Sequence, residues 1–256
     1  MGGKRWTNKE KDQLIKMNHE GFNYAEIANK LGRSHSSCQQ MGIKNLNLHG
    51  DMNIDENFFS QETEEKYYIL GYWLADGCIV NKGGGYYFYI TSIDKDHLEN
   101  IAKIMMVKRK VCKRSNCNAY DLVVGNKRLV KNLMNIGGKY RKTKTMTIND
   151  ITFEEKYFYT LLRGFFDGDG GYQYQGYKRA DGTRSISAIK FTGSKLMIKS
   201  IYDYLGYGVF REDSRKNNCY YLSFYGDKMR MLLHKMYDNS TIYLERKYKI
   251  YEKSLL

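Results

Sequence analysis

The chain has 256 residues, and its 42 lysines and arginines outnumber its 28 aspartates and glutamates, for a formal net charge of +14. This charge indicates a polyanionic partner, with nucleic acid first, and the length excludes a peptide-sized scaffold. No apolar run approaches the ~20 residues that cross a bilayer, and no signal-peptide core is present, so we expect an intracellular, cytoplasmic protein without a membrane partner. The five cysteines lack the spacing of a zinc site and are expected to be reduced thiols.

Charge divides the sequence into three parts. Residues 1–50 hold eight basic and four acidic side chains, whereas residues 51–65 hold six acidic side chains and no basic one. The remainder carries a net charge of +16. We therefore predict an N-terminal domain (1–50), an acidic linker (51–65) and a basic body that consists of two repeats, 66–149 and 150–256.

Three short helices are expected in the N-terminal domain. Thr7 and Glu10 have the spacing of a capping box that begins the first helix, which Gly21 ends. After a second helix, Ser34 can cap a third that runs from His35 to about Leu46. Helices joined by a glycine-containing turn are typical of a helix-turn-helix, whose last helix enters the major groove. A small helical bundle that contacts protein is the alternative.

This domain resembles the Myb/SANT-like helix-turn-helix over about 45 residues. The residues that carry the resemblance are Trp6, Thr7, Glu10, Leu14, Gly21 and the run IANKLGRS at Ile27–Ser34. It implies DNA binding through the polar side chains of the third helix. The candidate contacts to base edges or phosphates are Ser36, Ser37, Gln39, Gln40 and Lys44.

Two later segments share an apolar run that ends in Asp-Gly: ILGYWLADG at Ile69–Gly77 and LRGFFDGDG at Leu162–Gly170. Each has small residues four positions apart, which lie on one helix face and let two backbones approach closely. Packing of these helices would bring Asp76 and Asp169 together at their C-terminal ends. Adjacent carboxylates are costly unless cations lie between them, and Mg²⁺ prefers such oxygen ligands.

The two segments resemble the paired motifs of LAGLIDADG homing endonucleases. The matching positions are Leu162, Gly164, Asp167, Asp169 and Gly170 in the second segment, and Gly71, Ala75, Asp76 and Gly77 in the first. The first segment departs from the signature at Leu74, where the family has an earlier aspartate that is not the metal ligand. The ligand position maps onto Asp76 and Asp169, so the resemblance implies two intact half-sites.

After each motif the chain repeats itself. Thr91 and Gly125 have counterparts 101 residues later, at Thr192 and Gly226, whereas the motif aspartates lie 93 residues apart. The eight extra residues of the second repeat fall in a hairpin region, Gln173–Arg184, where insertions cost least. The predicted fold class is α+β: two pseudo-symmetric αββαββα repeats that form a DNA-binding saddle, preceded by a small all-α helix-turn-helix domain.

Four runs in the repeats are rich in β-branched and aromatic residues with basic residues interleaved: Tyr86–Ile90, Lys108–Arg114, Ser185–Phe191 and Tyr220–Tyr225. We expect one face of each sheet to pack on helices and the other, basic face to contact duplex DNA. The candidate contacts are Lys108, Lys110, Arg114, Lys178, Arg179, Arg184, Lys190, Arg211 and Arg215. Any one of them alone could be a solvated surface charge.

Both repeats carry a late basic run, YRKTK at Tyr140–Lys144 and ERKYK at Glu245–Lys249. In the family, a lysine near the start of this segment lies beside the metal site and stabilises charge or positions water. The resemblance therefore implies catalytic roles for Lys142 and Lys247. Lysines at helix ends are also common on ordinary protein surfaces.

These observations and the resemblance together predict a site-specific double-strand DNA endonuclease, a monomeric hydrolase that uses two or more Mg²⁺ ions. Asp76 and Asp169 would hold the ions, carbonyls near Ala75 and Gly168 would complete the coordination, and each half would cut one strand. The family implies a long asymmetric target site, 3′ overhangs and intron or intein mobility. Two alternatives stay open on this scaffold: a DNA-binding regulator without cleavage, and a maturase with intron RNA as its partner.

Overall fold

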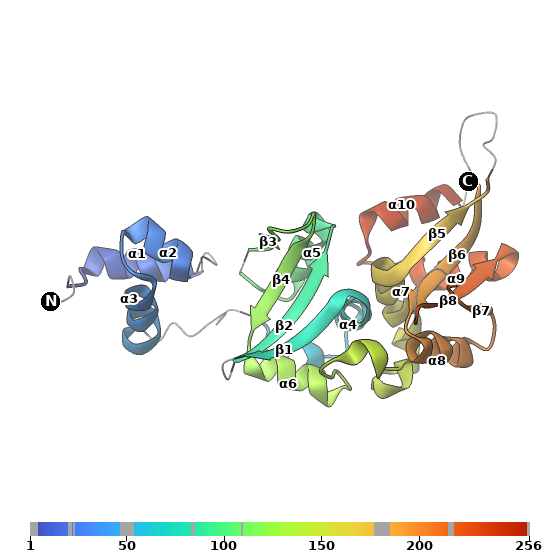
Figure 1. Cartoon of the computed structure of the whole chain (residues 1–256), viewed down its shortest axis with the longest axis horizontal. Coiled ribbons are helices and arrows are strands. Elements are labelled where there is room, and N and C mark those ends of the chain that lie inside the picture. Colours follow the sequence, from blue (N-terminus) through green and yellow to red (C-terminus); the bar gives the residue numbers. More distant parts are fainter. Residues whose placement is uncertain are drawn as a thin grey trace.

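The computed structural model describes residues 5–19, 22, 24–46, 54–82, 85–108, 110–176, 185–214 and 218–254. Figure 1 shows a small helical module at one end of the molecule, followed by two parts that each combine a sheet with helices. Within these ranges, no helix has both the length and the apolar composition needed to cross a membrane. All five cysteines are free thiols.

The N-terminal module contains the three expected helices. They are α1 (Asn8–His19), α2 (Tyr24–Leu31) and α3 (His35–Gln40), and the π-helical turn Met41–Asn45 continues α3. The side chain of Ser34 caps α3 by accepting a hydrogen bond from the backbone N–H of Ser37 at 3.2 Å. Leu14, Ile27, Ala28 and Cys38 form a small buried core of their own. Gly21, which the sequence assigns to the end of the first helix, lies outside the described residues.

One arginine fastens the start of α1 to the turn after α2. The backbone N–H of Thr7 donates to Glu10 Oε2 at 2.9 Å and that of Glu10 donates to Thr7 Oγ1 at 3.2 Å, which is the predicted capping box. Arg33 donates to both oxygens of Glu10 at 3.0 Å, and its guanidinium lies 4.1 Å from the centre of the Trp6 ring. These hydrogen bonds, with that from Arg33 the strongest, lower the pKa of Glu10 to about 2.

The two repeats have the same order of elements and the same sheet topology. The first contains α4 (Glu64–Asp76), β1 (Gly77–Lys82), β2 (Gly85–Ser92), α5 (Lys95–Ile104), β3 (Cys112–Lys113), β4 (Tyr120–Gly125) and α6 (Lys127–Asn135). The second contains α7 (Phe158–Asp169), β5 (Gly170–Tyr174), β6 (Ile186–Gly193), α8 (Lys195–Leu205), β7 (Val209–Glu212), β8 (Tyr220–Tyr225) and α9 (Gly226–Tyr237), followed by α10 (Glu245–Ser254). The antiparallel sheets run β1-β2-β4-β3 and β5-β6-β8-β7, so the repeats are related by pseudo-symmetry.

Short 3-10 turns occupy the connections. They are η2 (Phe58–Ser60), η3 (Lys142–Lys144), η4 (Ile148–Asp150) and η5 (Glu155–Tyr157). The predicted extra residues of the second repeat lie between β5 and β6, in a connection whose residues 177–184 fall outside the described ranges.

The prediction of a strand over Lys108–Arg114 is wrong for most of that run. Among the residues of this run that the structure describes, which leave out position 109, only Cys112 and Lys113 pair with β4, opposite Asp121 and Tyr120. The run is dense in positive charge and lies at the edge of the sheet, where like charges repel and only one neighbouring strand is available. The sequence pattern of this run reflects its strand propensity. That propensity is insufficient to form a strand without hydrogen bonds to a neighbouring strand.

The open face of the first sheet also differs from the basic surface that the sequence suggests. Phe88, Ile90 and Leu122 point into the core. Because side chains alternate, the residues between them on the two central strands face the other way. Those residues are Tyr87, Tyr89, Thr91, Asp121 and Val123, none of them basic. The positive charge of this repeat therefore lies mainly outside its two central strands.

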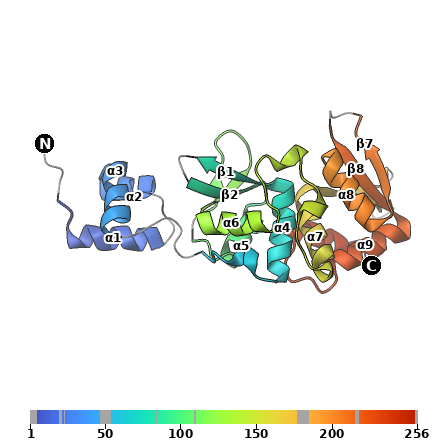
Figure 2. The same ribbon diagram turned by 90° about the horizontal axis from the view of Figure 1, so that it is seen from below.

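The motif helices α4 and α7 pack side by side at the centre, with one sheet on either side (Figure 2). The backbones come so close that a Cβ atom at Gly71 would lie 2.0 Å from the carbonyl oxygen of Leu161. A Cβ at Gly164 would lie 2.0 Å from the carbonyl oxygen of Tyr68. The close approach predicted from the spacing of small residues is thus present, and it requires glycine at both positions.

Candidate functional site

Each motif helix ends at an aspartate that is followed by a glycine and a strand. The glycine is required by an aromatic side chain one turn earlier. A Cβ at Gly77 would lie 2.0 Å from Cδ1 of Trp73, and one at Gly170 would lie 2.1 Å from Cδ2 of Phe166. The Asp-Gly pair therefore lets the helix turn directly into the strand beneath a bulky ring.

The two aspartates lie at one interface. A Cβ at Gly168 would lie 2.3 Å from Cβ of Ala75 and 3.3 Å from Oδ2 of Asp76, so the end of α7 touches the carboxylate of α4. Burial, and then the charge of Asp169, raise the pKa of Asp76 to about 6. Burial also raises the pKa of Asp169. Two carboxylates held together in this way disfavour their own charged forms unless cations compensate them.

A buried lysine lies at the end of each motif helix. Lys142, in η3, donates through Nζ to the carbonyls of Leu74 at 2.5 Å and Ala75 at 3.5 Å. Burial lowers its pKa to about 8, while Asp169 and Asp76 oppose that shift. The Ala75 carbonyl, predicted as a metal ligand, thus has an ammonium beside it.

Lys247, in α10, makes the equivalent contacts in the second repeat. Its Nζ donates to the carbonyls of Phe166, Asp167 (2.9 Å) and Gly170 (2.6 Å). Its pKa is also lowered to about 8 by burial, against the raising effect of Asp167. Both ammonium groups stay mostly charged at neutral pH and place positive charge at the ends of the motif helices.

Asp167, which the first motif replaces by Leu74, is fully enclosed. Its carboxylate accepts hydrogen bonds from the hydroxyl of Tyr68 at 2.7 Å, from the hydroxyl of Tyr237, and from the backbone N–H of Leu244 at 2.7 Å. It therefore anchors the segment that leads into α10 and to Lys247, and it is not directed to solvent where a cation would enter.

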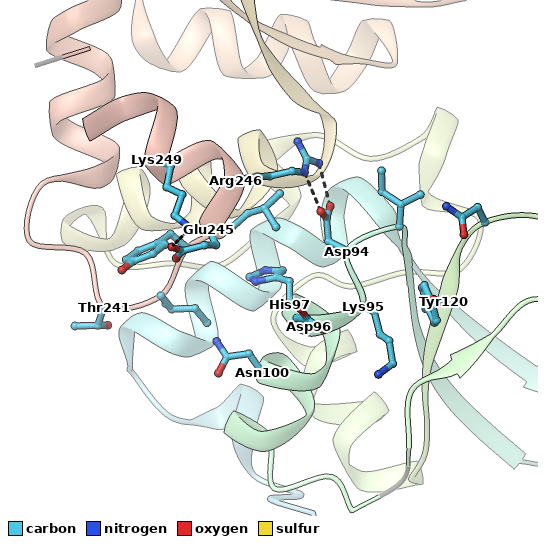
Figure 3. A pocket seen from close by; sticks show the side chains of 15 residues that line it. Asp94, Lys95, Asp96, His97, Asn100, Tyr120, Thr241, Glu245, Arg246 and Lys249 are labelled. Atoms are coloured by element: carbon cyan, nitrogen blue, oxygen red, sulfur yellow. Dashed lines mark hydrogen bonds and ion pairs between the residues drawn. The ribbon is translucent and has the colours of Figure 1, made fainter. Parts of the chain in front are cut away.

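Two hollows lie between the repeats, and the smaller one reaches Asp169. A small cavity of about 70 Å³ is bordered by Ala75, Lys142, Asp169 and Ser194. A wider groove of about 850 Å³ lies between α5 and the start of α10, where Asp94 and Arg246 form an ion pair across the two repeats (Figure 3). Sequence reasoning missed this pair, because its partners are 152 residues apart and neither belongs to a motif.

The available donors suit a hard divalent cation. The two carboxylates and the neighbouring main-chain carbonyls supply oxygen ligands, which Mg²⁺ and Ca²⁺ prefer. Across the ranges that the structure describes, no group of three or more His, Cys, Asp or Glu residues could hold a metal ion. A cation at this interface would therefore depend on carbonyl and solvent oxygens in addition to Asp76 and Asp169.

The candidate DNA contacts of the N-terminal module divide into two groups. Ser36, Gln39, Gln40 and Lys44 are exposed. Ser37 is half-buried, and its hydroxyl accepts a hydrogen bond from Trp6 Nε1 at 3.2 Å. Ser37 therefore holds the module together, which is a role that the helical pattern does not reveal.

The basic candidates of the repeats lie in varied surroundings. Arg114 donates to Asp121 at 2.9 Å, and Lys190 Nζ lies 3.6 Å from the centre of the Tyr221 ring. Arg211 is exposed on β7. Lys108 and Lys110 precede β3, and Lys110 Nζ lies 4.4 Å from the ring of Phe22 in the N-terminal module. The other four, Lys178, Arg179, Arg184 and Arg215, lie outside the described residues.

Comparisons with known proteins bear on this geometry. Residues 63–137, which contain α4 and the first sheet, match the family model of the LAGLIDADG-like domain. The search of curated proteins gives no match. The Myb/SANT-like resemblance of the N-terminal module stays a prediction.

Solved LAGLIDADG structures resemble most of the chain. The meganuclease I-SmaMI bound to uncleaveable DNA with a TTGT central four has a TM-score of 0.53 at 14% identity, and the match covers 74% of this chain and 88% of that chain. The I-LtrWI LAGLIDADG homing endonuclease bound to target DNA has a TM-score of 0.51 at 17% identity, with coverages of 75% and 88%. I-SmaMI bound to uncleaved DNA in the presence of calcium ions has a TM-score of 0.50 at 14% identity, with coverages of 74% and 88%. The predicted α+β fold with two antiparallel four-stranded sheets is confirmed.

Proposed function

We propose that this protein is a DNA endonuclease that cuts both strands of a specific duplex site with the help of divalent cations, Mg²⁺ in the cell. The observation that carries the proposal is the pair Asp76 and Asp169, brought together by two closely packed helices and each accompanied by a buried lysine. The likeness to solved endonucleases described with target DNA supports duplex DNA as the substrate.

Each aspartate would hold a divalent cation on its own side of the interface. A bound divalent cation lowers the pKa of a coordinated water and offsets the charge of a scissile phosphate. Lys142 and Lys247 add fixed positive charge beside the developing negative charge, where the low local dielectric strengthens the attraction. Because their ammonium groups also donate to the carbonyls of the motif helices, they hold the ends of those helices in place.

The cost of the aspartate pair argues for cleavage over simple DNA binding. A protein that only binds DNA gains nothing from two buried carboxylates whose pKa values are raised by burial and which would face the phosphates with negative charge. With cations bound, the positive charge of the ions compensates the negative charge of the carboxylates, which then serve to hold the ions. A site of this kind fits phosphodiester hydrolysis with one aspartate for each strand.

The DNA target would be recognised by the two sheets together with the N-terminal module. The two pseudo-symmetric sheets differ in sequence, so the protein as a monomer would recognise an asymmetric site. The resemblance to LAGLIDADG homing endonucleases implies that this site is long and that cleavage leaves 3′ overhangs. The exposed polar side chains of α3 would add contacts on one flank. The same resemblance implies a role in intron or intein mobility.

The decisive experiment incubates the full chain with a randomised duplex library in Mg²⁺ and sequences the cleaved ends. The double variant Asp76→Asn/Asp169→Asn is the matched control, because it keeps the size and polarity of both side chains. We expect one enriched site with wild type and none with the variant. Absence of cutting by wild type, with tight DNA or RNA binding retained, would favour the regulator or the maturase.

A further inference from the structure

Arg114 is held on the open face of the first sheet by a carboxylate. Its Nε donates to Oδ2 of Asp121 at 2.9 Å, and Oδ1 of the same carboxylate accepts a hydrogen bond from the hydroxyl of Thr91 at 2.6 Å. The Asp121 side chain is 19% exposed, whereas that of Arg114 is 48% exposed. Both carboxylate oxygens are therefore engaged, and the guanidinium is the solvent-exposed end of this network.

Strand register places the three side chains on the face that points away from the core. Thr91 of β2 and Cys112 of β3 both lie opposite Asp121 of β4. Arg114 follows Cys112 by two positions, so its side chain faces the same way, and its backbone N–H donates to the carbonyl of Ala119 at 2.9 Å. Arg114 and Asp121 are thus diagonal neighbours across two strands, a separation that long side chains span.

The ion pair uses only part of the guanidinium. The hydrogen bond to Asp121 comes from Nε, and the two Nη groups of Arg114 take no part in it. The thiol of Cys117, in the loop between β3 and β4, also acts on the guanidinium, but a thiol is a weak acceptor that a stronger one displaces. Two N–H donors held in a fixed orientation match the O6 and N7 acceptors of guanine in the major groove.

The charge on this face favours contact with a base over contact with a phosphate. The other open-face residues of the two central strands are uncharged, and Asp121 neutralises Arg114. A neutral pair gains little from the DNA backbone, where affinity comes from net positive charge. Base recognition depends instead on the direction of the donors, which a carboxylate fixed from two sides supplies.

The second sheet carries a carboxylate at the corresponding place. The backbone hydrogen bond that Arg114 makes in the first sheet has its equivalent between the N–H of Asp213 and the carbonyl of Cys219, at 2.8 Å. Tyr221 takes the place of Asp121, opposite the matching threonine of β6. An ionised carboxylate has no hydrogen to donate to O6 or N7 of guanine. The contact therefore belongs to the half of the target that the first repeat would cover.

We propose that Arg114 reads a guanine in that half of the DNA target, and that Asp121 and Thr91 position its guanidinium. This inference rests on the proposed function, of which it uses only the binding of duplex DNA along the open faces of the sheets. A well-formed bidentate contact of this kind corresponds to a preference of roughly 10- to 100-fold for guanine over the other bases.

Base preference measured without cleavage tests the inference. The full chain binds a randomised duplex library in EDTA, the bound DNA is sequenced, and Kd is measured on duplexes that carry each base pair at every enriched guanine. In Arg114→Ala and Arg114→Lys we expect the preference at one position to fall to about threefold or less, while the other positions keep theirs. Lysine keeps the charge and loses the fork, so Arg114→Lys should retain most of the affinity for sequences without that guanine.

The positioning residues have a signature that a merely structural role would not give. Asp121→Asn should lower the guanine preference and strengthen binding to unselected duplex, because it removes a negative charge and releases Arg114. The plot of log Kd against log salt should then steepen by about 0.9, the contribution of one phosphate contact. Thr91→Val, which keeps the shape of the side chain and removes its hydroxyl, should lower the preference by a smaller factor. A structural role alone would weaken binding to every sequence equally.

Arg128→Ala is the matched control. It removes an exposed arginine of the same repeat, on α6, which lies 3.8 Å from Glu56 in an ion pair, and it should leave every base preference unchanged. The inference is overturned if wild type enriches no guanine or if Arg114→Ala keeps the full preference. Weaker binding to all sequences in Arg114→Ala, with a salt slope reduced by about 0.9, would also overturn it and make Arg114 a phosphate contact.

These outcomes are separate from those that test cleavage. Failure of wild type to cut DNA in Mg²⁺ would overturn the proposed function, and the base preferences in EDTA would still decide the role of Arg114. Cleavage by wild type together with an unchanged preference in Arg114→Ala would leave the proposed function in place and remove this inference.

Discussion

Asp76 is held at a position where its charge is unfavourable until a cation arrives. Its pKa in the folded protein is about 6, against 3.8 for an unperturbed aspartate. A carboxyl whose folded pKa is raised destabilises the fold increasingly as the pH rises from its unfolded value through its folded value. The destabilisation is absent below about pH 4 and complete above about pH 6.

This linkage predicts that Asp76→Asn stabilises the protein when no metal is present. At pH 7 in EDTA we expect a gain of about 2 kcal/mol in the free energy of unfolding, somewhat below the full value of the pKa shift because part of the carboxylate is exposed. The gain should shrink toward pH 4. Denaturant unfolding of Asp76→Asn and of the exposed control Asp238→Asn measures it, and a destabilised Asp76→Asn at pH 7 would refute the account of the pKa.

The two lysines predict the alkaline side of the pH profile. Lys142 and Lys247 have pKa values near 8, lowered by burial, so they lose their charge as the pH rises through 8. Since that charge supports cleavage, kcat/KM should fall above about pH 8. Rates measured from pH 6.5 to 9.5 on a cleaved duplex test this, and a profile that stays flat to pH 9.5 would contradict the role of the ammonium groups.

Removal of one ammonium should mainly affect one strand. Lys247→Met keeps the length of the side chain and removes its charge, and we expect a loss of about 100-fold or more in cleavage of the strand served by Asp76. The matched control is Lys249→Met, on the same helix, where the lysine is exposed and pairs with Glu245. If both variants cut both strands at the wild-type rate, Lys247 has no part in catalysis.

At the scale of elements, the interface of α4 and α7 depends on backbone contact. Gly71→Ala would place a Cβ 2.0 Å from the carbonyl oxygen of Leu161, so the two helices must separate and the aspartates with them. We expect a loss of at least about 3 kcal/mol in stability. Gly171→Ala, on β5, is the control, because a Cβ there meets nothing within 4 Å and the change should be under about 1 kcal/mol. Similar unfolding midpoints for the two variants would contradict the packing.

A feature of these elements could be predicted from the sequence where it depends on residues close together in the chain. The meeting of α4 and α7 could be predicted because residues four apart share a helix face whatever surrounds them. Strand formation at Lys108–Arg114 could not, since it depends on whether β4 offers a partner. The positions of Lys142 and Lys247 came from family resemblance alone. The ion pair of Asp94 depends on how the repeats dock, and no local pattern contains that information.

At the scale of the whole molecule, the N-terminal module has its own buried core, formed by Leu14, Ile27, Ala28 and Cys38. Deletion of residues 1–50 should therefore leave the unfolding of the repeats nearly unchanged. We expect it to shorten the DNA footprint on one flank and to weaken binding, with a shallower salt dependence as phosphate contacts are lost. Footprinting of both forms on a cleaved duplex measures this, and an identical footprint would refute DNA binding by the module.

The two repeats bring Asp76 and Asp169 to one interface, and each aspartate is proposed to serve one DNA strand. The most direct test labels both 5′ ends of a cleaved duplex and compares Asp76→Asn with Asp169→Asn on a denaturing gel. We expect each variant to nick a single strand, and the two variants to nick opposite strands. Double-strand cutting at the wild-type rate by either variant, or nicking of the same strand by both, would contradict it.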